Sequence, residues 1–137
     1  MTHLTTDTVP IAGEDVVLLT VPADVSYLAV LRTATAGLAA RLQFALDEIE
    51  DLRIAVDEAC AMLLSIAAPD AELDCRFVVG EDMLVVEVTV PTPPDAQLPA
   101  RSSFAWKVLT ALTTEVSASM RDDRAMIRLF TQRPTRP

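Results

Sequence analysis

The sequence contains very little glycine and almost no histidine. Its three glycines, Gly13, Gly37 and Gly80, lie far apart, so no phosphate-binding loop of the G-x-G-x-x-G or G-x-x-x-x-G-K type is present. The only histidine, His3, lies in the N-terminal leader. Catalytic arrangements of the Ser-His-Asp or Cys-His kind, and metal sites built on histidine, are therefore not expected.

Long apolar runs are also missing. No apolar stretch reaches the roughly 18 residues that a membrane span needs. The first ten residues carry neither a basic start nor a long apolar stretch, so we expect no signal peptide. These absences predict a cytoplasmic protein without membrane contacts.

Basic residues are outnumbered, 11 against 20 acids, which gives a net charge of −9 at pH 7. This balance argues against direct nucleic-acid binding, because phosphate contacts need clustered lysine and arginine. One interpretation of the uneven charge is a solvated helix face and a polar tail; the other is an electrostatic docking surface. The clustered acids are Asp47, Glu48, Glu50, Asp51, Asp57 and Glu58, and the C-terminal arginines are Arg121, Arg124, Arg128, Arg133 and Arg136.

The 137 residues, 51% of them hydrophobic, are enough for one domain with a single core. We predict a flexible leader at 1–13, one domain at 14–131 and a disordered tail at 132–137. The predicted fold class is α+β: a two-layer sandwich in which three helices cover one face of a mixed or antiparallel sheet of about five strands. Periodicity predicts a strand at 16–21, helices at 25–42 and 47–67, strands at 72–79 and 83–90, a helix at 104–114, and strands at 116–120 and 125–130.

Few side chains suggest chemistry. Cys60 lies on the apolar stripe of the second helix and Cys75 inside a strand, so we interpret both as structural, with a redox-sensitive thiol as the alternative. Asp57 and Glu58 are neighbouring carboxylates, but adjacent helix positions point about 100° apart and do not face one substrate. The residues alone therefore indicate no catalyst and no metal site.

The helix at 25–42 is apolar on most of its surface, because alanines and valines flank its stripe of leucines. Such a helix is expected to be covered on most sides. One side packs on the sheet, so we predict that the other side, with Ala34, joins a homodimer together with the edge of the first strand. The alternative is that alanine, a good helix former, tolerates exposure.

Two segments resemble a known family. Residues 49–60 (IEDLRIAVDEAC) resemble the N-box helix in the anti-sigma branch of the GHKL, or Bergerat-fold, ATPases. Residues 103–112 (SFAWKVLTAL) are similar to a helix of actinobacterial anti-sigma factors of the RsbW type. The order of elements also matches that family over nearly the whole chain, so the resemblance implies a Bergerat-type fold.

The resemblance also implies partners. Proteins of this kind bind an alternative sigma factor and withhold it from RNA polymerase. A STAS-domain anti-anti-sigma factor competes for them and frees the sigma factor, a partner switching associated with stress responses. Many members also use ATP to phosphorylate a serine or threonine of that antagonist.

The nucleotide site is where the sequence departs from the family. Glu58 matches the N-box glutamate that activates the attacking hydroxyl, but Met62 stands where the family has an asparagine for Mg²⁺, and sulfur is a poor ligand for this hard cation. The adenine-reading Asp-x-Gly-x-Gly segment corresponds to 90–94, which has no glycine, and Ser103 and Ala105 replace a later glycine pair. We therefore expect no cofactor and a binding module that has lost kinase activity.

Two alternatives stay open. One is an ATP-dependent serine/threonine kinase that uses Glu58 and Mg-ATP to phosphorylate the anti-anti-sigma factor. The other is a dimerisation domain without a sigma partner. A basic sigma fragment that co-purifies with the chain supports the binding module, and bound nucleotide supports the kinase. The absence of both supports the dimerisation domain.

We predict that the sigma factor docks on the helix at 25–42, the loop at 43–45 and the acidic start of the second helix. Sigma factors present basic DNA-binding segments, to which clustered acids offer a complementary field. An arginine can hold a sigma carboxylate in its planar fork, and apolar side chains supply the central contacts. The predicted contact residues are Val30, Arg32, Arg41, Phe44, Asp47, Glu48, Glu50 and Asp51.

Overall fold

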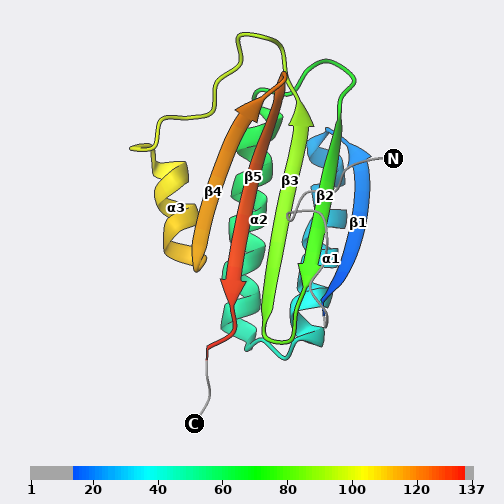
Figure 1. Cartoon of the computed structure of the whole chain (residues 1–137), viewed down its shortest axis with the longest axis vertical. Coiled ribbons are helices and arrows are strands. Elements are labelled where there is room, and N and C mark those ends of the chain that lie inside the picture. The colour runs from blue at the N-terminus through cyan, green and yellow to red at the C-terminus, as the bar shows by residue number, and fades with distance from the viewer. Residues whose placement is uncertain (1–13, 135–137) are drawn as a thin grey trace, which may run out of the picture.

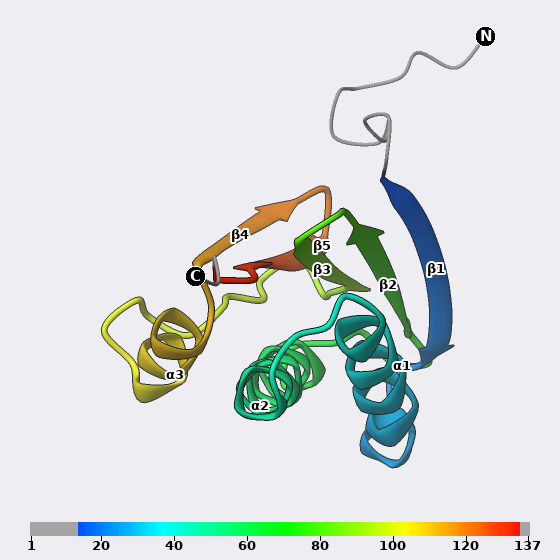
Figure 2. The ribbon, with the colours of Figure 1, turned by 90° about the horizontal axis from the view of Figure 1, so that it is seen from below.

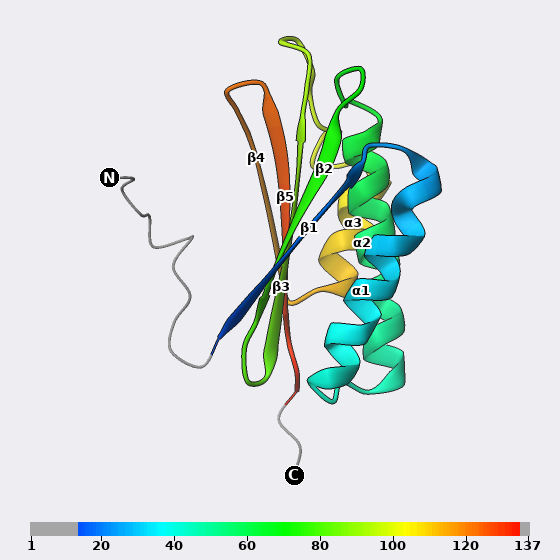
Figure 3. The ribbon, with the colours of Figure 1, turned by 90° about the vertical axis from the view of Figure 1, so that its right-hand side faces the viewer.

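The computed structural model describes residues 14–134, which form a two-layer α+β sandwich (Figure 1). Five strands make one antiparallel sheet in the order β1-β2-β3-β5-β4. Three helices cover one face of this sheet, and within residues 14–134 no helix lies on the other face (Figures 2 and 3). The elements are β1 (Asp15–Pro22), α1 (Leu28–Arg41), α2 (Leu46–Leu64), β2 (Glu72–Val79), β3 (Met83–Pro91), α3 (Phe104–Leu112), β4 (Glu115–Arg121) and β5 (Arg124–Gln132).

This architecture confirms the predicted fold class, and the sheet is antiparallel throughout rather than mixed. The predicted strands all form, and β5 extends to Gln132. The Arg133 N–H also donates to the Asp82 carbonyl at 2.7 Å. The predicted leader at 1–13 and residues 135–137 of the predicted tail lie outside the described residues.

The helix boundaries differ from the predictions for local reasons. The first helix begins with a 3-10 turn at Val25–Tyr27, because Asp24 accepts a hydrogen bond from the Ser26 N–H at 2.8 Å. The second helix ends at Leu64 instead of residue 67. Its last turn tightens there, since the Ile66 N–H bonds to the Leu63 carbonyl at 3.1 Å.

The core lies between the helices and the inner face of the sheet. Alternate residues of β2, β3 and β5 point toward the helices. The central helix α2 contributes the buried side chains of Leu52, Val56 and Leu63 to the same core. Phe77 is fully buried beneath these helices, the largest of the fully buried side chains. Burying one such side chain stabilises the fold by about 1.5–3 kcal/mol.

Both cysteines belong to this core and both carry free thiols. Burial raises the pKa of Cys60 to about 12, and Asp57 adds a smaller effect in the same direction. Burial likewise raises the pKa of Cys75. Because the thiolate is the reactive form, these protonated thiols favour the structural interpretation.

The outer face of the sheet carries a ladder of charges on three neighbouring strands. Arg76 of β2, Glu87 of β3 and Arg128 of β5 stand in register. The Glu87 carboxylate lies 3.5 Å from the Arg76 guanidinium and 3.2 Å from that of Arg128. Glu87 is only 18% exposed, so this ladder is partly shielded from water.

In the part of the chain that the structure describes, we find no helix with the length and hydrophobicity to cross a membrane.

Candidate functional site

The resemblance points first to Glu58 and Met62, four residues apart on one face of α2. Glu58 is half-buried, whereas Met62 is only 4% exposed and packs within the hydrophobic core. The Met62 thioether therefore occupies apolar surroundings instead of facing a polar cavity. Within residues 14–134, no group of three or more histidine, cysteine or carboxylate side chains is placed to hold a metal ion. The residues present do not fit Mg²⁺.

The start of α3 departs from the family pattern in the same region. Ser103 occupies the N-cap position, but its side chain caps no backbone N–H. Its hydroxyl is buried without a hydrogen-bond partner, and Ala105 is half-buried in the first turn. Both positions carry a Cβ atom where a phosphate would need close approach to the backbone.

The proline-rich connector between β3 and α3 is tied to α3 by the only tryptophan. The Trp106 indole N–H donates to the Pro99 carbonyl at 2.6 Å. The Arg101 guanidinium lies 4.3 Å from the centre of the same ring, a cation–π contact. The connector is thus held against a buried side chain, since Trp106 is only 3% exposed.

The predicted partner residues are only partly brought together. The start of α2 lies near the end of α1 (Figure 1). Arg41 is the last residue of α1, the first two turns of α2 carry Asp47, Glu50 and Asp51, and all four residues are exposed. Val30 is exposed too, but it precedes Arg41 by 11 residues, about 16 Å along a helix. The acidic residues of the predicted surface therefore lie near the C-terminal end of α1, whereas Val30 lies near its N-terminal end.

Three other predicted contacts have roles within the fold. Phe44 is only 5% exposed and belongs to the core, so the prediction that it supplies an apolar partner contact is corrected. Arg32 forms an ion pair with Asp57 at 3.0 Å and joins α1 to α2. The Glu48 carboxylate accepts a hydrogen bond from the Ala45 N–H and so caps α2.

Val30 and Ala34 line an apolar hollow between α1 and β1. Its volume is about 520 Å³, and Leu19, Ala29 and Thr33 complete the lining. It adjoins β1, which is an edge strand of the sheet that residues 14–134 form. The homodimer through Ala34 and this edge stays a prediction, and an open edge beside an apolar hollow favours it.

The sequence is similar to known proteins over much of its length. It is 40% identical over 106 residues to the anti-sigma-F factor RsbW of Mycobacterium tuberculosis H37Rv, a match that covers 76% of this chain and 61% of the relative. It is 40% identical over 77 residues to the serine-protein kinase RsbW of Bacillus subtilis, covering 54% of this chain and 48% of the relative. No family model matches the sequence.

The similarity and the fold together confirm the class that the N-box-like helix indicated, a GHKL-type domain. Within that class, the chain is similar to RsbW proteins, one named an anti-sigma-F factor and the other a serine-protein kinase. It spans about 61% of the length of the mycobacterial relative and 48% of the Bacillus one.

Proposed function

We propose that the chain is an anti-sigma factor that sequesters an alternative sigma factor by direct contact and is relieved by a STAS-domain antagonist. The observation that carries this proposal is the 40% identity over 106 residues to a mycobacterial protein named an anti-sigma-F factor. The two-layer sandwich with its N-box-like helix α2 supports it. A sigma factor acts with RNA polymerase, so the proposal includes a cytoplasmic location.

We propose further that binding needs no nucleotide and that kinase activity is lost. Support comes from Met62, buried where the family places a magnesium ligand, and from the Cβ atoms of Ser103 and Ala105. Phosphoryl transfer depends almost wholly on holding the phosphates and the metal. The fixed connector at Trp106 also leaves less freedom for a lid to close over a nucleotide.

A second candidate function is a serine-protein kinase, because the Bacillus subtilis relative carries that name. Glu58 is the residue that this alternative requires, and its half-buried carboxylate lies on the same helix face as Met62. Position 62, however, is a methionine and offers no oxygen ligand for a metal ion. We therefore favour the nucleotide-independent binder.

The exposed acids at the start of α2 suit a basic sigma segment. Asp47, Glu50 and Asp51 are all exposed, and Leu46 beside them is 82% exposed. These four residues line one open hollow at the helix start. Apolar contact at Leu46 surrounded by carboxylates matches the pattern of an interface with a charged rim.

Removing these charges tests whether the acids at the start of α2 take part in sigma-factor docking. In the triple variant Asp47→Asn, Glu50→Gln, Asp51→Asn, we expect the association rate with the cognate sigma factor to fall about tenfold at low salt, because electrostatic steering is lost. Glu48 is left in place because it caps α2. The measurement is stopped-flow association at low and high salt, and the salt dependence should flatten in the variant.

A variant of equal net charge provides the control. Glu72→Gln, Asp95→Asn and Glu115→Gln remove three exposed acids outside this surface. If both triple variants slow association equally, only net charge matters and the acids at the α2 start are an ordinary solvated helix face. If neither changes the rate, charge steering plays no part in docking.

A further inference from the structure

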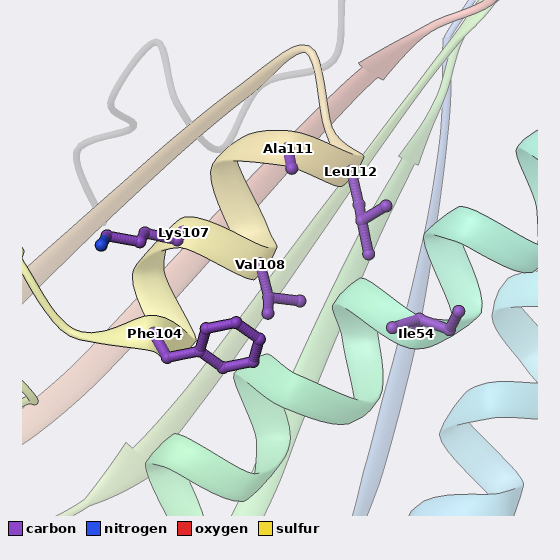
Figure 4. A pocket seen from close by; sticks show the side chains of 6 residues that line it. All are labelled: Ile54, Phe104, Lys107, Val108, Ala111 and Leu112. Carbon is purple, nitrogen blue, oxygen red and sulfur yellow. The ribbon is translucent and has the colours of Figure 1, made fainter.

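A second surface on the helical layer has a lining that includes none of the predicted sigma contacts. An apolar groove of about 470 Å³ lies between α2 and α3. Figure 4 shows Phe104 and Val108 of α3 pointing toward α2, where Ile54 faces them, while the Lys107 amine points away. Ala111 and Leu112 complete the lining.

The groove exposes large apolar side chains that the fold does not need to expose. Phe104 is 79% exposed and Ile54 is 47% exposed, although the buried stripe of α3 is already supplied by Trp106 and Leu109. Phe104, Val108, Ala111 and Leu112 form a second stripe at helical spacing on α3. A contiguous exposed apolar surface of this kind marks an interaction site.

Carboxylates border the groove on the α2 side. Asp51 and Glu58 lie one turn before and one turn after Ile54, so they share its helix face. No salt bridge within residues 14–134 joins either carboxylate to a base. Asp57, by contrast, faces α1 and is paired with Arg32 at 3.0 Å. The groove therefore has an apolar lining, and the α2 face that carries Ile54 also carries these two carboxylates.

We propose that this groove docks an amphipathic, basic α-helix of a partner protein. Its apolar face would cover Phe104, Val108 and Ile54, and its lysines or arginines would meet Asp51 and Glu58. A helix fits better than a strand, because walls made of helices offer no free backbone edge for strand pairing. The nine residues of α3 extend about 13 Å, which accommodates about two turns of a guest helix.

The groove shares none of its lining residues with the hollow at the start of α2, although Asp51, which lines that hollow, lies next to the groove. The proposal holds for any partner that presents such a helix. The probe is a designed helical peptide of about 18 residues, with leucine at every third or fourth position and lysine at the others. A matched peptide carries glutamate in place of every lysine. Neither peptide contains tryptophan.

Methyl and amide NMR spectra of the full chain report where each peptide binds. We expect the lysine peptide to shift the methyl signals of Ile54, Val108 and Leu112, and the glutamate peptide to bind at least about tenfold more weakly. Phe104→Ala should weaken the lysine peptide by about tenfold or more. Because Phe104 is exposed, this variant should keep the fold.

Two further variants complete the test. Leu18→Ala removes a side chain that is 71% exposed on β1, and it should leave peptide affinity unchanged. The pair Asp51→Asn and Glu58→Gln should abolish the preference for lysine over glutamate.

Three results would overturn the proposal. The first is absence of binding, or shifts spread away from α2 and α3. The second is a Phe104→Ala variant that binds like the wild type. The third is a set of groove signals that shift with protein concentration alone, which would assign the surface to a second copy of the chain.

Discussion

Titration of the purified chain with Mg-ATP is expected to give no binding heat, and no phosphate should pass to a STAS-domain protein. Met62 is buried in the core where a magnesium ligand would be required, and a thioether does not replace an oxygen donor for this ion. Ser103 and Ala105 place Cβ atoms at the helix start that would meet the phosphates. Calorimetry measures the binding heat, and a radiolabel assay measures phosphate transfer.

The variant Met62→Asn provides a second test of whether the chain binds nucleotide. It restores the family residue, but we expect no gain of nucleotide binding because the glycine segments are still missing. It should also lower the free energy of unfolding by about 2–4 kcal/mol, since it buries an amide in apolar surroundings and leaves a cavity. Saturable, magnesium-dependent heat in the wild type would contradict the nucleotide-independent account.

Replacing Glu87 by glutamine is expected to destabilise the chain by about 2 kcal/mol. The single carboxylate serves two guanidinium groups, those of Arg76 and Arg128, and its side chain is only 18% exposed. Without the charge, two partly shielded arginines lose their counter-ion on the outer face of the sheet. Urea unfolding followed by circular dichroism measures the change.

The exposed pair of Arg53 and Glu50 supplies the control for this prediction. Its N–O distance is 3.0 Å, but its side chains are 37% and 55% exposed. Glu50→Gln should therefore change the free energy of unfolding by less than about 0.5 kcal/mol. Equal effects of the two substitutions would show that the ladder on the sheet contributes no more than a surface pair.

The fold could be predicted from the sequence because its signals are local. Alternation in Val86, Val88 and Val90 marks a strand with one buried face, and the apolar stripe of α2 marks a helix that packs on one side. The helix ends were predicted less accurately, because they depend on individual hydrogen bonds. These are the bond that Asp24 accepts and the bond that tightens the turn after Leu64.

The candidate surfaces were harder to predict, because they depend on contacts between distant segments. Phe44 follows α1 in a short loop and looked available, but the turn directs it into the core. The groove between α2 and α3 joins Ile54 to residues some 50 positions later, and only the packing of the helices creates it. A second apolar stripe on α3 was the one sequence signal for it.

Under the proposed function, this chain captures a sigma factor without a nucleotide. The direct measurement is surface plasmon resonance with the immobilised chain and each purified sigma factor of the source organism, with and without Mg-ATP. We expect one alternative sigma factor to bind with the same affinity in both conditions, and a STAS-domain antagonist to displace it. Failure of every sigma factor to bind, or binding that requires Mg-ATP, would contradict it.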